Sequence, residues 1–419
     1  MQYNIPRGTY DILPEQSWRW QKLIQLFRDT AQDFGYQEMV TPIFEVVELF
    51  ERSSGEGSDI VQKEMYRFQD RKGRWLALRP EGTAPVVRSY IENNLDALGR
   101  ITKLYYLGPM FRYDRPQAGR YRQFYQYGVE LLGSHHPYYD AEIIALMHTY
   151  LQRLGLQQVR LEINSVGCPE CSKSYDQALI SYFEPHKSEL CPDCQIRLHK
   201  KPRRLLDCKV AACKAIAKAA PLMTAHLDSA CREHFEQVQS YLNLLQISYT
   251  LNPRIVRGLD YYTHTAFEFL NDRLGAQNAL GGGGRYNGLV SQLGGKDMPA
   301  VGLAGGFERL LLSLEQEGIS LGKKPTPAGC LICLGKAAEQ EGLKLLSQLQ
   351  ADGLSLVYDP EKDSLKAALK QASSLGCSFA LILGENELTQ RMIICKDLKT
   401  GLQEQVALSK VLTYLKSVT

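Results

Sequence analysis

The spacing of apolar residues predicts alternating helices and strands along most of the chain. Apolar residues recur at helical intervals over residues 14–34, with Pro14 and Gly35 placed to begin and end that helix. Residues 84–95 predict a second helix, and residues 301–314 predict a strand, a glycine turn and a helix. Short apolar runs predict strands at 38–41, 75–79, 103–107, 122–132 and 265–270. The runs at 103–107 and 122–132 are expected to pair antiparallel.

The last part of the chain predicts a separate small domain. Residues 323–327, with two lysines and two prolines, are typical of a linker. Beyond it, strands expected at 331–334, 355–357, 380–383 and 392–395 are interleaved with helices at 340–351, 365–375 and the end of the chain. This alternation indicates an α/β domain with a mixed sheet over residues 326–419.

Cysteine, lysine and helix-forming residues replace the strand pattern over residues 167–235, which indicates an inserted helical subdomain. The chain has 11 cysteines, and clustered cysteines in a reducing compartment favour a metal over disulfides. Two C-x-x-C pairs have the spacing of a structural zinc site. The expected Zn²⁺ ligands are Cys168, Cys171, Cys191 and Cys194. Cys208 and Cys213 could replace one pair, and a set of reduced buried thiols is the alternative.

Composition and charge narrow the classes of protein. The chain has 419 residues, 44% hydrophobic and 23% charged, and a net charge of +3. These values are ordinary for a soluble protein of two or three domains, and they permit nucleic-acid binding without requiring it. No apolar run is long enough to span a bilayer, and the N-terminus lacks a signal-peptide core. A cytoplasmic protein without a membrane partner is expected.

Three segments carry residues suited to binding phosphates and polar substrates. Residues 108–124 contain four arginines and four aromatic residues between two predicted strands. Guanidinium groups clamp phosphate oxygens and aromatic rings stack on bases, so this loop suits a nucleotide or an RNA end. A solvated hairpin is the alternative. Residues 257–263 combine an arginine, an aspartate and two tyrosines, and Arg309 follows a glycine pair at the start of a helix.

Together these segments resemble the class II aminoacyl-tRNA synthetases. Residues 37–42 are similar to the first motif of that class, which forms its dimer interface; Phe111 and Arg112 with residues 120–130 are similar to the second; residues 305–312 are similar to the third. Further segments resemble motifs of the histidyl-tRNA synthetase family, and they span residues 6–11, 79–83, 257–262 and 282–286. The resemblance covers nearly the whole chain. It implies an α+β catalytic domain over residues 1–325, an antiparallel sheet flanked by helices, with the insertion inside it and an anticodon-binding domain after it.

The resemblance also implies a role for each site residue. The catalytic residues would be Arg112, Arg257 and Arg309. Those binding ATP would be Arg112, Phe124 and Arg309. Those binding histidine would be Glu81, Thr83, Gln126, Glu130, Tyr261, Tyr262 and Tyr286. Those meeting the tRNA acceptor end would be Arg115 and Gln117.

The implied reaction joins L-histidine to tRNA(His) through histidyl-adenylate, with ATP and Mg²⁺, in a homodimer. The first alternative is a regulatory paralogue, of the kind associated with ATP phosphoribosyltransferase, which binds histidine without activating it. That paralogue lacks the C-terminal domain and catalytic arginines, whereas this chain keeps both. The second alternative, an RNA-binding module, has no need for a pocket that combines Glu81, Glu130 and Tyr262.

Overall fold

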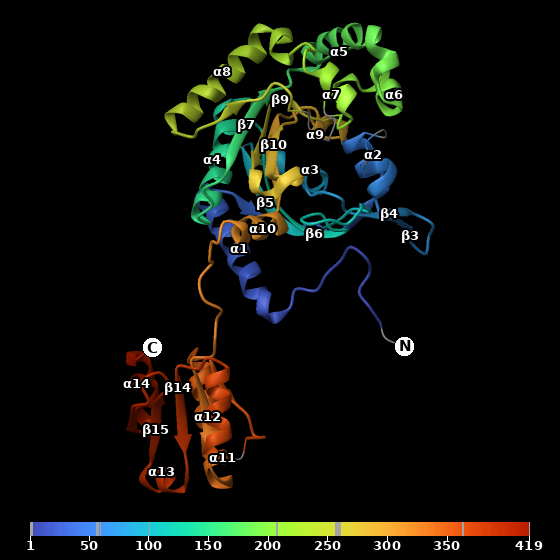
Figure 1. Ribbon diagram of the computed structural model, residues 1–419. Helices are drawn as coiled ribbons and strands as arrows, with labels where there is room; N and C mark the ends of the chain where they lie inside the picture. Colours follow the sequence, from blue (N-terminus) through green and yellow to red (C-terminus); the bar gives the residue numbers. More distant parts are fainter. Residues whose placement is uncertain are drawn as a thin grey trace. The chain divides into compact units, whose positions relative to one another are not determined.

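The chain forms two compact units in a computed structural model (Figure 1), Met1–Gly322 and Lys323–Thr419. The structure describes residues 3–418 except 56, 57, 59, 100, 207, 256–260 and 363. The division between the units falls where the lysine- and proline-containing linker begins. Each unit has its own sheet and its own core.

A largely antiparallel sheet is the centre of the first unit. In the described part of the chain its eight strands follow the order β1 (Gln37–Glu38), β5 (Thr102–Phe111), β6 (Gln123–Leu132), β11 (Ala300–Gly306), β10 (Ala279–Arg285), β9 (Thr263–Leu270), β7 (Arg160–Ser165) and β8 (Thr250–Leu251). Only the two short edge strands pair parallel to their neighbours. β5 and β6 pair from Thr102 opposite Leu132 to Phe111 opposite Gln123, which confirms the predicted antiparallel pair.

Helices lie on both faces of this sheet. α1 (Pro14–Asp33), α4 (Tyr138–Arg153) and α10 (Phe307–Gln316) share one hydrophobic core with the strands. At its centre the ring of Phe27 lies 6.0 Å from that of Tyr105 and 4.8 Å from that of Tyr127. On the opposite face, α3 (Thr83–Glu92) and α9 (Leu289–Gln292) pack beside Tyr106. Neighbouring residues of a strand point to opposite faces, so β5 supplies tyrosines to both cores.

A smaller sheet leaves apolar side chains in solvent. It has the order β2 (Phe44–Val46), β4 (Trp75–Leu78) and β3 (Arg67–Gln69), and α2 (Val47–Ser54) packs beside it. Phe44 and Phe68 have ring centroids 6.4 Å apart, and both are exposed, by 49% and 40%. Trp75 of β4 is also 51% exposed.

The cysteine-rich insertion is helical, as the sequence predicts, and has its own small core. It contains α5 (Pro169–Phe183), α6 (Pro192–Lys200), α7 (Ala211–Ala217) and the start of α8 (Ser229–Leu244), which lie together at one end of the first unit in Figure 1. Its core consists of buried cysteines together with residues such as Tyr175, Leu179 and Phe183. The later residues of α8 return to the core of the large sheet.

The second unit is the predicted α/β domain with a mixed sheet. Its strands follow the order β13 (Leu356–Tyr358), β12 (Gly329–Cys333), β14 (Phe379–Leu383), β15 (Met392–Asp397) and β16 (Gln403–Ala407). β13, β12 and β14 are parallel, and β15 and β16 are antiparallel to their neighbours. α11 (Lys336–Ala351) and α14 (Val411–Val418) cover one face, and α12 (Leu365–Ser374) covers the other. A short helix, α13 (Glu385–Gln390), precedes β15.

Six of the described strands were not predicted from the sequence, namely β2, β3, β7, β8, β10 and β16, and the last two lack the usual strand pattern. β10 has four consecutive glycines, a residue that is depleted in strands. β16 is a polar edge strand with mostly exposed side chains. None of the helices in the described part of the chain combines the length and the apolar character that crossing a bilayer would require.

A buried ion pair fixes the end of β10 against α4. Asp140 and Arg285 are both fully buried, and the guanidinium donates to the carboxylate at 2.6 and 2.8 Å. The same guanidinium donates to the main-chain oxygens of Ser134 and His136. Burial alone would raise the pKa of Asp140, but Arg285 and His234 outweigh burial and hold that pKa below its ordinary value.

Replacing Asp140 with alanine should destabilise the first unit by about 3–5 kcal/mol, because Arg285 is then left buried without its partner. The free energy of unfolding measured in urea would check this value. Asp272→Ala is the control, since Asp272 pairs with Arg160 at the surface and such pairs contribute about 1 kcal/mol or less. Similar small losses for the two variants would contradict a structural role for the buried pair.

Candidate active site

One cavity on the large sheet brings together ten of the residues predicted from the sequence. We call it the central cavity. Its lining includes Glu81, Thr83, Arg112, Phe124, Gln126, Glu130, Tyr261, Tyr262, Tyr286 and Arg309. They come from the start of α3 and the turn before it, from the residue after β5, from β6, from the two residues before β9, from the residue after β10 and from the first turn of α10. Residues far apart in the sequence therefore meet above the middle strands.

Glycines in β10 and β11 make room for this cavity. A Cβ atom at Gly302 would lie 1.8 Å from a carboxylate oxygen of Glu130. A Cβ atom at Gly283 would lie 1.9 Å from the carbonyl oxygen of Gly302. Real Cβ atoms do not approach other atoms so closely, and only glycine gives the backbone this access. The glycines thus allow a carboxyl group to be buried against the sheet.

Glu130 is that carboxyl group, and it is held from two sides. The hydroxyl of Thr83 donates to Oε1 at 2.7 Å, and the hydroxyl of Tyr286 donates to Oε2. The residue is 1% exposed. Burial raises the pKa of Glu130 to about 8, although the hydrogen bonds from Tyr286 and Thr83 work in the opposite direction. The group therefore holds or releases a proton near neutral pH.

Glu81 is a second buried carboxyl group at the same end of the cavity. It accepts the backbone N–H groups of Thr83 at 2.7 Å and Ala84 at 2.8 Å, at the start of α3. Burial raises its pKa, and the two N–H groups partly offset this rise. Gln126 accepts the N–H of Gly82 at 3.0 Å, which ties the turn to β6. Two carboxyl groups at one end suit a ligand with amine or imidazole N–H groups.

Main-chain carbonyl groups orient two of the arginines that line the cavity. Arg112 donates to the oxygen of Pro80 at 2.9 Å and lies 5.4 Å from the ring centroid of Phe124. Arg309 donates to Gly119 at 3.2 Å and to Ala279 at 2.8 Å. Burial lowers the pKa of Arg309, and the positive charges of Arg120 and Arg112 lower it further. Guanidinium groups held in this way suit the oxygens of a polyphosphate.

Several lining residues were not predicted from the sequence. Arg120 and Glu268 line the cavity, and so do the glycines of β10 and β11. Glu308 lines it too, and accepts the hydroxyl of Tyr10 at 2.8 Å and the backbone N–H of Tyr125 at 2.7 Å. Arg120 in the arginine-rich loop, and Glu308 and several of the glycines in the segments 282–286 and 305–312, could have been selected by their positions in motifs, whereas Glu268 carries no such signal.

Arg115 and Gln117 lie in the loop between β5 and β6, and both are exposed. Gln117 and Arg120 exchange backbone hydrogen bonds at 3.1 and 2.9 Å, so the loop forms a tight turn there. Arg257, predicted to be catalytic, lies outside the described residues, and its role stays a prediction.

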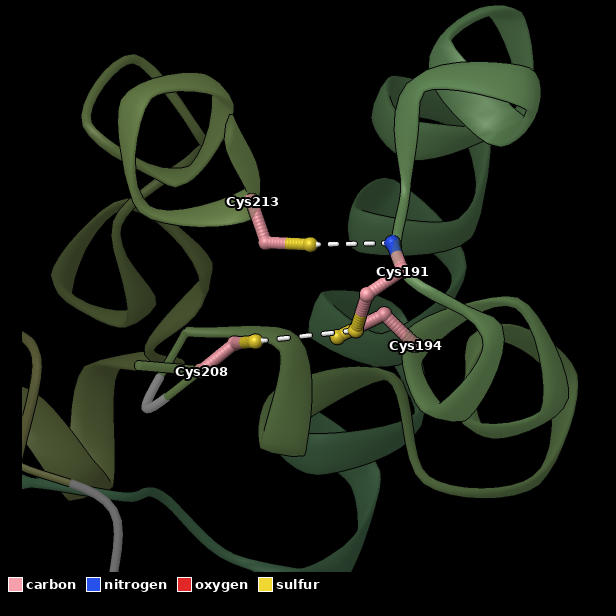
Figure 2. Close-up of side chains that lie close together, drawn as sticks. All are labelled: Cys191, Cys194, Cys208 and Cys213. Carbon is pink, nitrogen blue, oxygen red and sulfur yellow. Dashed lines mark hydrogen bonds between the residues drawn. The ribbon is translucent and has the colours of Figure 1, made fainter. Parts of the chain in front are cut away.

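The structure does not bring together the four cysteines predicted to share one zinc ion. It places them in two separate groups of side chains. The first group, the four-thiol cluster, consists of Cys191, Cys194, Cys208 and Cys213 (Figure 2). The second, the Asp228 cluster, consists of Cys168, Cys171, Asp228 and Cys231. Each C-x-x-C pair finds its partners later in the chain, so two candidate ligand sets replace the single predicted one.

Comparisons with known proteins agree with this fold and cavity. Residues 8–171 and 195–310 match the family model described as histidyl-tRNA synthetase, and residues 330–418 match that of an anticodon binding domain. The histidine--tRNA ligase of Pelotomaculum thermopropionicum is 50% identical over 411 residues, which are 98% of this chain and 97% of that one. That of Bacillus subtilis strain 168 is 49% identical over 423 residues, covering 100% and 99%. The apo crystal structure of the Staphylococcus aureus histidyl-tRNA synthetase superimposes with a TM-score of 0.85 at 40% identity, covering 99% and 100%.

The antiparallel sheet, the cavity on it and these matches define a class II aminoacyl-tRNA synthetase, which is a ligase. Within that class, the chain belongs to the histidyl-tRNA synthetase family. The similarity extends through the C-terminal domain, and this favours the catalytic synthetase over the regulatory paralogue.

The raised pKa of Glu130 has a consequence for stability. Below about pH 4.5 both the folded and unfolded chains are protonated at this group; between about pH 4.5 and 8 only the folded chain keeps the proton. Its contribution to stability is therefore present at low pH and is lost as the pH rises through about 8. In Glu130→Gln the free energy of unfolding should fall less over this range than in the wild type, as urea titrations at several pH values would measure. Glu142→Gln, which removes a buried carboxylate outside the cavity, is the control. Equal pH dependence for wild type and Glu130→Gln would contradict the assignment.

Proposed function

We propose that this enzyme activates L-histidine with ATP and then transfers the histidyl group to tRNA(His). One observation carries the proposal: a single cavity is lined by the buried carboxyl groups of Glu81 and Glu130 and by the oriented guanidinium groups of Arg112 and Arg309. The carboxyl groups suit the N–H groups of histidine, and the guanidinium groups suit the phosphates of ATP.

The chemistry of activation requires positioning rather than a strong base. The α-carboxylate of histidine is already ionised at neutral pH. One of its oxygens attacks the α-phosphorus of ATP, and the bond to the bridging oxygen breaks, which releases pyrophosphate. Alignment of the two groups and positive charge around the phosphorus lower the barrier to this step. Mg²⁺ that accompanies ATP would add positive charge at the phosphates.

The arginines supply this alignment. We assign Arg112 to the α-phosphate and to the carboxylate of histidine, and Arg309 to the γ-phosphate. Phe124, beside the guanidinium of Arg112, would stack on adenine. Arg257 would meet the α-phosphate from another direction; this assignment rests on the family resemblance.

The carboxyl groups select the amino acid. We assign Glu130 and Tyr262 to the imidazole, and Glu81 and Thr83 to the α-amino group. The remaining residues assigned to the histidine pocket are Gln126, Tyr261 and Tyr286. A pocket whose buried polar groups need these partners would reject analogues that lack them, by a factor of about 10⁴–10⁵ in comparable sites.

Contacts with tRNA are assigned to two places in the chain. Arg115 and Gln117 are exposed in the loop beyond Arg112 and would meet the acceptor end. Residues 326–419, which include the part matching the anticodon-binding model, would recognise the anticodon. The catalytic domain would then comprise residues 1–325, with residues 167–235 as its insertion. We place the enzyme in the cytoplasm.

A homodimer accounts for the apolar side chains exposed near the small sheet. Val40 is 80% exposed, and Phe44, Phe68 and Trp75 of that sheet are exposed as well. Soluble monomers rarely expose contiguous apolar patches of large area. Residues 37–42 resemble the dimer motif of the class, so we propose a second copy of this chain as the partner.

Pyrophosphate exchange with each of the twenty amino acids tests the activity. Exchange is expected with histidine alone, and exchange with other amino acids at a similar rate would overturn the proposal.

Glu130→Gln should weaken histidine binding by about tenfold or more, because a charge-assisted hydrogen bond contributes about 1.5–3 kcal/mol. Its effect on ATP affinity should be small. Titrations of each ligand, with Glu142→Gln as control, separate the two effects; equal weakening would make Glu130 a structural residue only.

Arg115→Ala and Gln117→Ala should leave histidine activation intact and slow the charging of tRNA. Both side chains lie outside the lining of the central cavity, so the ATP and histidine contacts are preserved. Comparing pyrophosphate exchange with aminoacylation in the same variants distinguishes the two steps. Lys22→Ala, which removes another exposed cation, is the control. An equal loss in both assays would remove these residues from tRNA recognition.

A further inference from the structure

The four-thiol cluster has the dimensions of a metal site. All four Sγ atoms lie within 4.8 Å of one another, and those of Cys191 and Cys208 are 3.9 Å apart. A tetrahedral zinc ion with Zn–S bonds of about 2.3 Å requires S···S separations of about 3.8 Å. The four cysteines are free thiols, so no disulfide occupies the site. Figure 2 shows that the side chains of Cys208 and Cys213 approach the Cys191–Cys194 pair from the opposite side.

The local backbone prepares the thiols to bind a cation. Cys191 is the N-cap of α6, and Pro192 occupies the first position of that helix, where its fixed φ is favourable. Cys194 follows in the first turn of α6, so the start of this helix brings both thiols to the cluster. The backbone N–H of Cys191 also donates to Sγ of Cys213 at 3.2 Å. Hydrogen bonds of this kind orient metal ligands.

We propose that the four-thiol cluster binds one zinc ion, which stabilises the insertion. Four protein thiolates leave no open position on a tetrahedral ion, so the site is structural rather than catalytic. The insertion has a small core, and Cys194 and Cys213 are themselves part of it. Binding a metal would therefore add directly to the free energy of folding of this segment.

The zinc ion would also fix a basic segment beside a second cavity. Lys200, Lys201, Arg203 and Arg204 lie between the second and third ligands in the sequence and line this cavity together with Tyr262 of the central cavity. Within the segment, Arg203 donates to Asp176 of α5 at 2.6 and 2.9 Å. Holding Cys194 and Cys208 together would close a short loop around these residues and limit their movement.

The Asp228 cluster carries a second zinc proposal on separate observations. Its Sγ atoms are 3.5 Å apart for Cys168 and Cys171, and 3.9 Å apart for Cys171 and Cys231. Oδ2 of Asp228 lies 3.3 and 3.2 Å from the first two, while Oδ1 accepts the backbone N–H of Cys231 at 2.7 Å. One carboxylate oxygen thus orients the residue, and the other faces the thiols. A second zinc ion here, bound by three thiolates and a carboxylate, would join the start of α5 to the start of α8.

Metal analysis of the untagged, full-length protein tests both sites. We expect about two zinc ions per chain. Cys208→Ser should lose one, Cys231→Ser should lose the other, and the double variant should lose both. Cys395→Ser, in the second unit, is the control and should keep both. One zinc ion that is lost only in Cys208→Ser would support the four-thiol site and overturn the second. One ion lost in both variants would mean a single shared site and overturn the two-site assignment.

A second measurement keeps the test decisive if a variant fails to fold. Native wild-type protein can be titrated with a mercurial thiol reagent in the presence of a zinc-sensitive dye. Zinc should be released in proportion to the clustered thiols modified, and chelation should then expose residues 167–235 to proteases. Zinc below about one-tenth equivalent, with these thiols reacting as fast as those of the unfolded chain, would overturn both proposals. Iron in place of zinc would overturn the assignment of the metal.

Discussion

The burial of the Glu130 carboxyl group is the constraint on which the active site depends. A carboxyl group without water is costly unless it is protonated or surrounded by hydrogen-bond donors. The structure supplies Thr83 from the start of α3 and Tyr286 from the end of β10 as donors. Gly302 gives the carboxyl group space that any other residue would fill. Tyr286 is itself positioned through its neighbour Arg285, which is paired with Asp140. The carboxyl group of Glu130 is thus connected, directly or through these neighbours, to the helices α3 and α4 and to the strands β6, β10 and β11.

The arginines that line the cavity are held in a different way from the buried carboxyl groups. Main-chain carbonyl groups orient two of them: Pro80 accepts from Arg112, while Gly119 and Ala279 accept from Arg309. Carbonyl groups direct a guanidinium without cancelling its charge, so the positive potential remains available to an anionic ligand. The nearby carboxylate of Glu308 is instead occupied by Tyr10 and the backbone of Tyr125.

Much of this could be predicted from the sequence, and the exceptions have physical reasons. Helical periodicity identified α1, which has one buried face, and continuous apolar runs identified β5 and β6, which are largely buried on both faces. β10 was missed because its glycines serve the cavity rather than the strand. The pairing of Asp140 with Arg285 depends on tertiary structure, as does the grouping of the cysteines. Spacing predicted which thiols share a turn, but each pair is completed by residues from other helices and loops. Motifs located the site residues, whereas packing decided their partners.

The pKa of Glu130 also bears on why the proposed substrate suits this pocket. At neutral pH the carboxyl group of the ligand-free site holds a proton, while the imidazole of free histidine, with an ordinary pKa of about 6.5, is mostly neutral. Placed together, the two groups share one proton. If the proton stays on Glu130, the carboxyl group donates to the imidazole; if it moves, a carboxylate faces an imidazolium. Either arrangement keeps both groups hydrogen-bonded, and neither requires a proton to be exchanged with solvent near pH 7.

A carboxylate that was ionised in the free site would have to lose its solvation to bind the same ligand, and a neutral amide could not accept the imidazolium form with equal strength. Burial of Glu130 thus makes the pocket complementary to a side chain that can share its proton.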